Sequence, residues 1–205
     1  MTKVKLCGIR RLEDVAILNE VKPDYAGFIF APSKRQVAVD EAEVLRQALD
    51  PSIPAVGVFV DADPLFIKEI VDAGIIQVVQ LHGHEDAIYI EETRQLIGDV
   101  PLMQAVRVAS QCDVNVDTTA DMLLFDAYSK GMQGGTGQQF NWDYLTAVDR
   151  PYFLAGGLNP DNIQIAIETV GPYAVDISSG VETDGVKDAT KIRTLMARIQ
   201  EADKQ

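Results

Sequence analysis

The sequence predicts an α/β fold, a single (β/α)8 barrel over residues 1–205. Short apolar runs alternate with longer amphipathic segments along the whole chain. The runs are apolar at successive positions, which is typical of parallel strands covered on both faces. The chain has 205 residues and is 47% hydrophobic, which suffices for one barrel of this type, whose lower limit is about 200 residues. These observations together favour a TIM barrel that fills the chain and leaves little room for a second domain.

Eight apolar runs are expected to form the strands. They cover residues 4–9, 25–30, 54–60, 78–82, 102–108, 122–126, 152–155 and 174–178. Alternation of strands with helices requires crossover connections, which make the strands parallel. An open, doubly wound sheet is the competing arrangement. The barrel is preferred because eight strand–helix units use the chain almost completely.

The segments between the runs have helix-like spacing of apolar residues. Helices are expected over 14–21, 40–49, 64–73, 86–97, 142–148, 161–170 and 190–202. Asp63 before Pro64, and Asn159 before Pro160, provide N-caps with proline near the first turn. Residues 111–119 are polar and β-branched and form only a weak helix candidate.

Composition limits the partners and the compartment. Eighteen Lys and Arg against 31 Asp and Glu give a formal net charge of −13, which disfavours nucleic acid and anionic membranes. No apolar stretch approaches the roughly 20 residues of a membrane span, and the first residues run straight into a strand-like pattern without a signal peptide. Two cysteines make no disulfide framework. A cytoplasmic protein is expected, either a monomer or a homodimer.

The expected active site lies where the strands end, because barrel enzymes build it from the loops that follow them. Two of these loops contain glycine and serine, which let backbone N–H groups approach an anion. The loops after the seventh and eighth strands are the recurrent phosphate site of such barrels. We therefore expect a phosphate to bind at Gly156, Gly157, Ser179 and Gly180; two ordinary turns are the alternative.

Cys7 and Asp126 end two different strands of the predicted barrel. A cysteine is more often a small buried apolar residue, and an aspartate here could simply cap a loop. At the reactive rim, however, a thiolate could remove a proton and a carboxylic acid could deliver one. The two residues are therefore the candidate acid–base pair.

Other polar residues at the same rim have less specific patterns. Arg35 could bind a carboxylate through its two-pronged guanidinium, or belong to a solvated Lys34–Arg35 pair. His82 could contact the substrate, or be an ordinary rim histidine. His84 is expected to be exposed, and a metal is not expected because no distant ligand set accompanies the two histidines. The glycine-rich residues 129–139 lack a Walker motif and suggest a lid over the substrate. No cofactor is expected.

The motifs at the strand ends, in their order along the chain, resemble those of the phosphoribosylanthranilate isomerase family of tryptophan biosynthesis. The matching motifs are Lys5-Leu6-Cys7-Gly8-Ile9, Gly27-Phe28-Ile29-Phe30, Ser33-Lys34-Arg35, Val56-Gly57-Val58-Phe59, Val79-Gln80-Leu81-His82-Gly83, Phe125-Asp126, Gly134-Gly135-Thr136-Gly137, Leu154-Ala155-Gly156-Gly157-Leu158 and Asp176-Ile177-Ser178-Ser179-Gly180-Val181-Glu182. Lys34 departs from the pattern, because the family commonly has proline there. The motifs extend over nearly the whole chain, and together they are specific.

The resemblance implies an Amadori rearrangement of N-(5-phosphoribosyl)anthranilate, a phosphosugar, to 1-(2-carboxyphenylamino)-1-deoxyribulose 5-phosphate. It implies that Asp126 protonates the ring oxygen and that Cys7 then removes the C2 proton. Arg35 would hold the anthranilate carboxylate, and Asp176 would lie near the ribose hydroxyls. Neither a cofactor nor a metal is implied.

Two other classes stay open at this point. Related phosphosugar barrels, such as indole-glycerol-phosphate synthase or a histidine-pathway isomerase, would be expected to use a lysine acid or an aspartate at the end of the first strand. The sequence has Cys7 at that position. A phosphate-ligand sensor without turnover would not need both Cys7 and Asp126.

Overall fold

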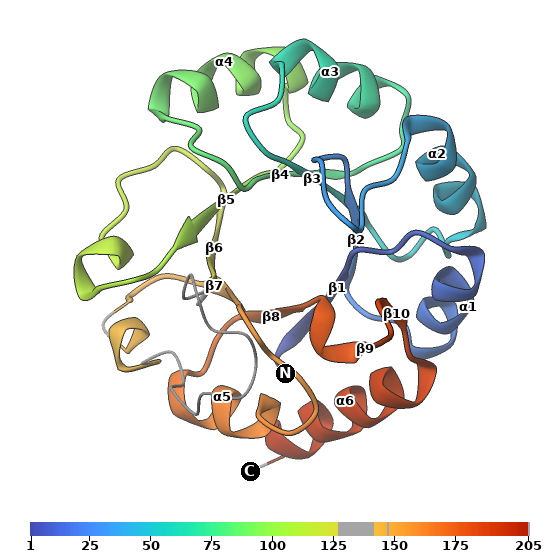
Figure 1. Cartoon of the computed structure of the whole chain (residues 1–205). Coiled ribbons are helices and arrows are strands. Elements are labelled where there is room, and N and C mark those ends of the chain that lie inside the picture. The colour runs from blue at the N-terminus through green and yellow to red at the C-terminus, as the bar shows by residue number, and fades with distance from the viewer. Residues whose placement is uncertain (127–141, 147, 205) are drawn as a thin grey trace.

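Eight parallel strands close into a barrel in the order of the chain, which confirms the predicted fold class (Figure 1). The computed structural model describes residues 1–126, 142–146 and 148–204. The barrel strands are β1 (Lys3–Cys7), β2 (Tyr25–Ile29), β3 (Ala55–Phe59), β4 (Val78–Leu81), β5 (Leu102–Arg107), β6 (Met122–Asp126), β7 (Tyr152–Ala155) and β8 (Ala174–Ile177). Each strand lies within a residue or two of its expected range.

In the described part of the chain, six α-helices surround the barrel (Figure 1). They are α1 (Leu12–Val21), α2 (Val39–Ala48), α3 (Pro64–Asp72), α4 (Ala87–Ile97), α5 (Ile163–Val170) and α6 (Ala189–Ala202). Asp63 caps α3 as expected, because its carboxylate accepts a hydrogen bond from the Leu65 N–H at 2.9 Å. α5 begins at Ile163, two residues later than expected, because the Asn159 side chain forms a turn by accepting from the Asp161 N–H.

Two connections lack a full α-helix in the part of the chain that the structure describes. The helix expected over 142–148 was wrong: a short 3-10 helix, η2 (Trp142–Leu145), stands there. The N–H of Thr146 bonds to the carbonyl of Asp143, and that of Val148 to Leu145, which is the i to i+3 spacing of a 3-10 helix. The weak candidate over 111–119 forms only η1 (Gln111–Val114).

After β8 the chain makes a small excursion before α6. The 3-10 helix η3 (Ser179–Val181) leads into a hairpin of β9 (Glu182–Thr183) and β10 (Val186–Lys187). The hairpin lies beside the ends of β8 and β1 in Figure 1. This excursion brings two charged side chains, Glu182 and Lys187, back to the barrel mouth.

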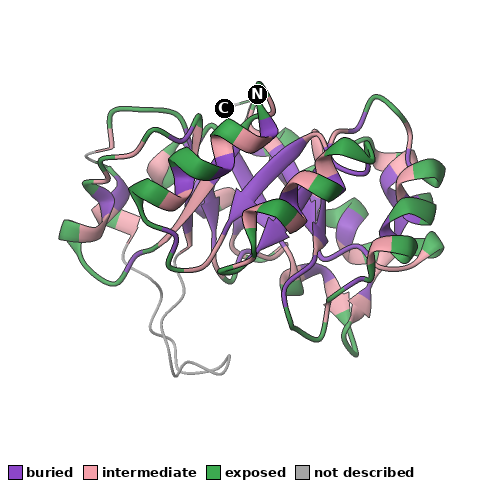
Figure 2. Ribbon diagram, turned by 90° about the horizontal axis from the view of Figure 1, so that it is seen from above, coloured by how far each residue is buried: buried purple, intermediate pink, exposed green. Residues whose placement is uncertain are grey.

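Apolar residues fill the space on both sides of the strands, which are the most buried part of the molecule (Figure 2). The larger cluster packs the strands against the helices. A smaller cluster comprises Met103, Leu124, Phe153, Ala155 and Ala174. Leu124 and Asp126 are two residues apart on β6 and so face the same way. The smaller cluster therefore closes the barrel interior beneath the polar residues at the strand ends.

The two ends of the chain meet at one end of the barrel (Figure 2). The backbone N–H of Thr2 donates to both carboxylate oxygens of Asp203, at 3.0 and 2.9 Å, and the Thr2 hydroxyl donates to the same carboxylate. Among the described residues no helix is long and apolar enough to cross a membrane.

Candidate active site

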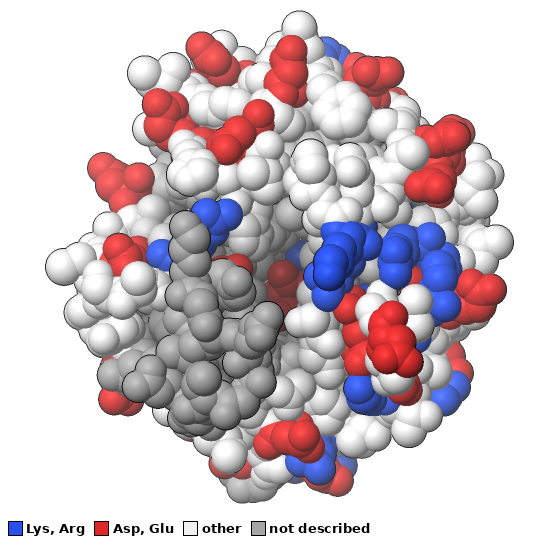
Figure 3. Space-filling view, viewed as in Figure 1, with Lys and Arg blue, Asp and Glu red and all other residues white. Residues whose placement is uncertain are grey.

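A cavity of about 220 Å³ opens at the carboxyl ends of the strands. The space-filling view shows it as a hollow at the centre of this face (Figure 3). Eight of the nine predicted site residues line it: Cys7, His82, Asp126, Gly156, Gly157, Asp176, Ser179 and Gly180. The ninth, Arg35, is not part of the lining. The structure thus brings together residues from β1, β4, β6, β7 and β8.

Cys7 ends β1 and is buried, with 6% of its surface exposed. The space for its sulfur comes from the neighbouring strand, where Cys7 pairs with Gly27. A Cβ at position 27 would lie 2.7 Å from the Cys7 Sγ and 2.9 Å from its Cα. Glycine on β2 is therefore a steric requirement of having the thiol in the cavity wall.

Asp126 ends β6, which β7 and β8 separate from β1 and Cys7 around the barrel. Its Oδ2 lies 3.2 Å from the Nε2 of His82. The Nδ1 of His82 is in turn 2.9 Å from the amide nitrogen of Gln80. These two contacts join Gln80, His82 and Asp126 in one chain of polar groups. Gln80 and His82 therefore fix the direction of the Asp126 carboxyl.

Lys5 and Asp176 form a buried ion pair across β1 and β8, with 2.9 Å between Nζ and Oδ2. Sequence reasoning selected Asp176 and missed Lys5. Burial would lower the pKa of Lys5, but the carboxylate of Asp176 and the thiol of Cys7 outweigh it, so that the pKa is raised. A lysine two residues before Cys7, and therefore on the same face of β1, is the signal that could have identified it.

The two glycine-containing loops of the expected phosphate site are interlocked. Gly156 and Gly157 have φ angles of 98° and 65°, which favour glycine. Gly180, at the centre of η3, lies against the Leu158 backbone, so that a Cβ there would be 1.8 Å from the Leu158 carbonyl oxygen. The loop after β8 therefore rests directly on the loop after β7.

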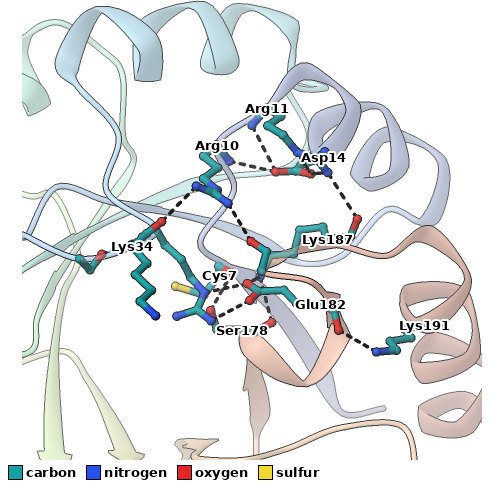
Figure 4. A network of polar contacts seen from close by, with 12 residues as sticks. Cys7, Arg10, Arg11, Asp14, Lys34, Ser178, Glu182, Lys187 and Lys191 are labelled. Atoms are coloured by element: carbon teal, nitrogen blue, oxygen red, sulfur yellow. Dashed lines mark hydrogen bonds and ion pairs between the residues drawn. The ribbon is translucent and has the colours of Figure 1, made fainter.

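Arg35 lies beside the cavity, where Glu182 binds it. Its Nε and Nη2 each donate to a different oxygen of the Glu182 carboxylate, both at 2.7 Å. Within the described residues, its Nη1 makes no hydrogen bond, and that nitrogen remains for a ligand. The backbone of the loop is held by Arg10, whose Nη1 donates to the Lys34 carbonyl at 3.1 Å (Figure 4).

Glu182 and Lys187 are two further charged residues that sequence reasoning did not assign. The Nζ of Lys187 donates to Glu182 Oε1 at 2.8 Å and to the Ser178 carbonyl at 2.9 Å (Figure 4). Burial alone would raise the pKa of Glu182, but the hydrogen bonds from Arg35 and Lys187 lower it to about 2. No local pattern reveals this cluster, because Arg35 and Glu182 are 147 positions apart.

The remaining candidates lie away from the cavity or outside the described residues. His84 is exposed, as expected, and contacts Asp61 at 3.1 Å. Cys112 is an exposed free cysteine. Within the described residues, no three His, Cys, Asp or Glu side chains are grouped to hold a metal ion. The glycine-rich loop interpreted as a lid, residues 129–139, lies outside the residues that the structure describes.

Charge is distributed unevenly around the cavity. Basic side chains gather along one side of the hollow, although the protein as a whole carries a net charge of −13 (Figure 3). Burial raises the pKa of the Cys7 thiol, and Lys5 and Lys187 act in the opposite direction. A buried thiol with cations near it, facing a carboxyl group across a cavity, is suited to moving a proton between neighbouring substrate atoms.

Comparison with known proteins identifies the family to which the sequence is similar. Residues 4–198 match the family model described as N-(5'phosphoribosyl)anthranilate (PRA) isomerase. The N-(5'-phosphoribosyl)anthranilate isomerase of Endomicrobium trichonymphae is 47% identical over 192 residues, which is 94% of this chain and 95% of that protein.

Two solved structures are also similar. One is phosphoribosyl anthranilate isomerase in complex with reduced 1-(o-carboxyphenylamino)-1-deoxyribulose 5-phosphate, with a TM-score of 0.82 and 33% identity over 98% of this chain and 100% of that one. The other contains monomers generated from the dimeric enzyme of Thermotoga maritima, with the same TM-score, identity and coverage.

Proposed function

The chain belongs to the N-(5'-phosphoribosyl)anthranilate isomerase family, and from this we propose how its residues carry out the reaction of that family. The enzyme is an aldose–ketose isomerase of tryptophan biosynthesis. It converts N-(5'-phosphoribosyl)anthranilate to 1-(2-carboxyphenylamino)-1-deoxy-D-ribulose 5-phosphate by an Amadori rearrangement. The observation that carries the assignment of roles is that Cys7 and Asp126 line one cavity from two separate strands.

Asp126 acts first, as the general acid. Its carboxyl proton passes to the ring oxygen of the ribose while the bond from that oxygen to C1 breaks. The lone pair of the anthranilate nitrogen forms a double bond to C1, which gives an open-chain Schiff base. His82 supports this step, because its hydrogen bond to Oδ2 holds the carboxyl group in one direction.

Cys7 acts second, as the general base. Its thiolate removes the proton from C2, and the electrons of that C–H bond form an enolamine as the C1–N double bond becomes single. Tautomerisation of the enolamine gives the ketone at C2. The base and the acid come from strands separated by β7 and β8, so the two proton transfers take place on different sides of the same substrate.

The ends of the substrate are bound by groups outside this pair. Gly156, Gly157, Ser179 and Gly180 bind the phosphate through backbone groups, in the interlocked loops after β7 and β8. The Nη1 of Arg35 is the donor available for the anthranilate carboxylate. Asp176 binds a ribose hydroxyl through Oδ1, which is buried and makes no hydrogen bond to the residues that the structure describes.

The protein's partners follow from the same relatives. A phosphosugar ligand is supported by the relative with reduced product bound. A homodimer is the proposed assembly, because the Thermotoga maritima relative is dimeric. We propose a cytoplasmic enzyme with one domain over residues 1–205 and no cofactor.

The assignment of roles is tested by two conservative variants. Cys7→Ala and Asp126→Asn are expected to remove most turnover while leaving the circular dichroism and the unfolding midpoint close to those of the wild type. Loss of the substrate's fluorescence measures turnover, and Cys112→Ala serves as the matched control because that cysteine is exposed. Turnover at the wild-type rate in either active-site variant would contradict its role.

A further inference from the structure

Two lysines near Cys7 are almost wholly buried. The Lys5 side chain is 0% exposed and that of Lys187 is 1% exposed. Burying an ammonium group is costly unless it is paired, and lysine is seldom fully buried without a partner. Both lysines have a carboxylate partner, but the proposed steps above use neither of them. Their place around Cys7 requires a separate explanation.

Lys5 reaches Cys7 along the first strand. The two residues are two positions apart on β1, so both point into the barrel. Its Nζ is 2.9 Å from Asp176 Oδ2, and Asp176 lines the same cavity as Cys7. Lys5 therefore holds a positive charge against the inner side of the thiol.

Lys187 approaches from the other side, on the hairpin after η3. It donates at 2.9 Å to the carbonyl of Ser178, and the hydroxyl of Ser178 donates at 3.1 Å to the carbonyl of Cys7. Figure 4 shows Cys7 within this network. Two hydrogen bonds through a single residue thus fix Lys187 relative to the end of β1.

The charges around Cys7 do not balance without the thiolate. Three cations, Lys5, Lys187 and Arg35, are paired with only two carboxylates. Asp176 binds Lys5, while Glu182 binds both Lys187 and Arg35. Before substrate binds, one positive charge is left over among these groups, and a thiolate at Cys7 would neutralise it.

We propose that Lys5 and Lys187 are positioning residues that stabilise the thiolate of Cys7 and so set the fraction of enzyme ready to remove the C2 proton. The proposal rests on the role of Cys7 as the base of the reaction. Neither lysine needs to touch the substrate, because each acts through the charge that it holds beside the sulfur.

The directions of the pKa shifts agree with this geometry. Burial raises the pKa of Cys7 above its ordinary value, Lys5 and Lys187 act against that rise, and Asp176 adds to it. Burial lowers the pKa of Lys5, but Asp176 and the thiol outweigh it, so the pKa is raised. Burial also lowers the pKa of Lys187, and there Glu182 and the thiol offset it only in part, so the pKa stays below its ordinary value. Across the cavity, His82 and Asp126 complete the titratable groups that line the same space.

The test measures ionisation of the thiol directly. In a Cys112→Ser background, the ultraviolet absorbance of the thiolate is followed against pH, and the signal of Cys7→Ser is subtracted. Lys187→Met is expected to move the midpoint upward by roughly 1 pH unit, since a nearby opposite charge shifts a pKa by about that much or more. Lys187→Arg, which keeps the charge, is expected to stay near the wild type.

A matched control distinguishes the effect of a lysine's charge on the Cys7 thiol from the effect of losing a lysine that only holds the hairpin in place. The Nζ of Lys191, a residue of α6, also donates to Glu182, but to its backbone carbonyl oxygen, at 2.7 Å. Lys191→Met is expected to leave the thiol midpoint unchanged. Lys5→Met provides an independent second reading, with a larger upward shift because it leaves the Asp176 carboxylate unopposed. A folding failure in one lysine variant therefore leaves the other to decide.

The outcomes distinguish this proposal from the proposed function. It is supported if Lys187→Met shifts the thiol midpoint and the acid limb of the turnover–pH profile by the same amount. An unchanged midpoint in the folded lysine variants would overturn it, even with Cys7 as the base. A shifted midpoint with an unchanged turnover profile would show that the lysines govern the thiol but that Cys7 is not the base.

Discussion

Gly27 and Cys7 lie in such close contact that a methyl group at position 27 would reach within 2.7 Å of the sulfur. Gly27→Ala is therefore expected to push the thiol out of position and to lower kcat tenfold or more, since small misplacements of a catalytic group are costly. It should also destabilise the fold by about 1–3 kcal/mol through overpacking. Steady-state kinetics and urea unfolding measure the two effects.

Gly57→Ala is the matched control for Gly27→Ala. A Cβ at position 57 would be as crowded, but its nearest neighbours are the side chains of Ile76 and Phe59, at 2.6 and 2.8 Å. Stability should fall while kcat stays near the wild-type value. An equal loss of kcat in both variants would mean that the effect of Gly27 comes from general strain in the barrel.

The buried pair of Lys5 and Asp176 predicts a strong dependence of stability on the carboxylate. Asp176→Asn leaves an ammonium group buried without its counter-charge, which typically costs about 3–5 kcal/mol. The exposed pair of Glu20 and Arg193 gives the comparison, because Glu20→Gln breaks only a solvent-screened surface pair and should cost far less. The free energies of unfolding in urea at neutral pH measure both, and equal losses would contradict the prediction.

His82 is expected to act on turnover through Asp126. His82→Ala removes the hydrogen bond at 3.2 Å that directs the carboxyl group, so kcat should fall roughly 10- to 100-fold with a smaller change in KM. His84→Ala is the control, because that side chain is exposed. A rise in KM with unchanged kcat would instead assign His82 to substrate binding.

Because of Glu182, the free energy of unfolding should fall as the pH is lowered into the acid range. Its pKa is lowered from 4.5 to about 2 in the folded state. Its contribution is therefore present above about pH 4.5 and is lost as the pH falls toward 2. Glu182→Gln should be less stable than the wild type near neutral pH, and the difference should close toward pH 2.

Unfolding in urea at several pH values measures the effect of Glu182→Gln. The exposed Glu92 serves as a control, and Glu92→Gln should leave the curve unchanged. A constant difference between wild type and Glu182→Gln across the range would show that Glu182 contributes by packing rather than by its charge.

Gly180→Ala tests the expected phosphate site. Its Cβ would overlap the Leu158 carbonyl oxygen at 1.8 Å, which forces the loops after β7 and β8 apart. Inorganic phosphate as a competitive inhibitor should bind roughly tenfold or more weakly, because backbone donors lose their common geometry. Unchanged inhibition would place the phosphate elsewhere.

The strands could be predicted because parallel strands covered on both faces are continuous apolar runs in sequence. That Cys7, Asp126 and the glycine loops lie at one cavity could be predicted because each follows directly from where a strand ends. The pairing of Arg35 with Glu182 could not, since it joins residues 147 positions apart. Lys5 was missed because a lysine inside a strand has no local partner: Asp176 is 171 positions away. Charge pairs across the barrel depend on its closure, which local patterns do not encode.

The contact of Gly180 with Leu158 bears on how the enzyme keeps its substrate bound while the sugar ring opens. The sugar is cyclic at the start of the reaction and open at the end, so its length and flexibility change while it is bound. Because the two loops pack against each other, the expected phosphate site is already ordered, and little conformational entropy is lost on binding. On the proposed mechanism, we expect the phosphate to stay bound in one place while the ring opens, so that the acid and the base act in turn on a substrate that does not leave the enzyme.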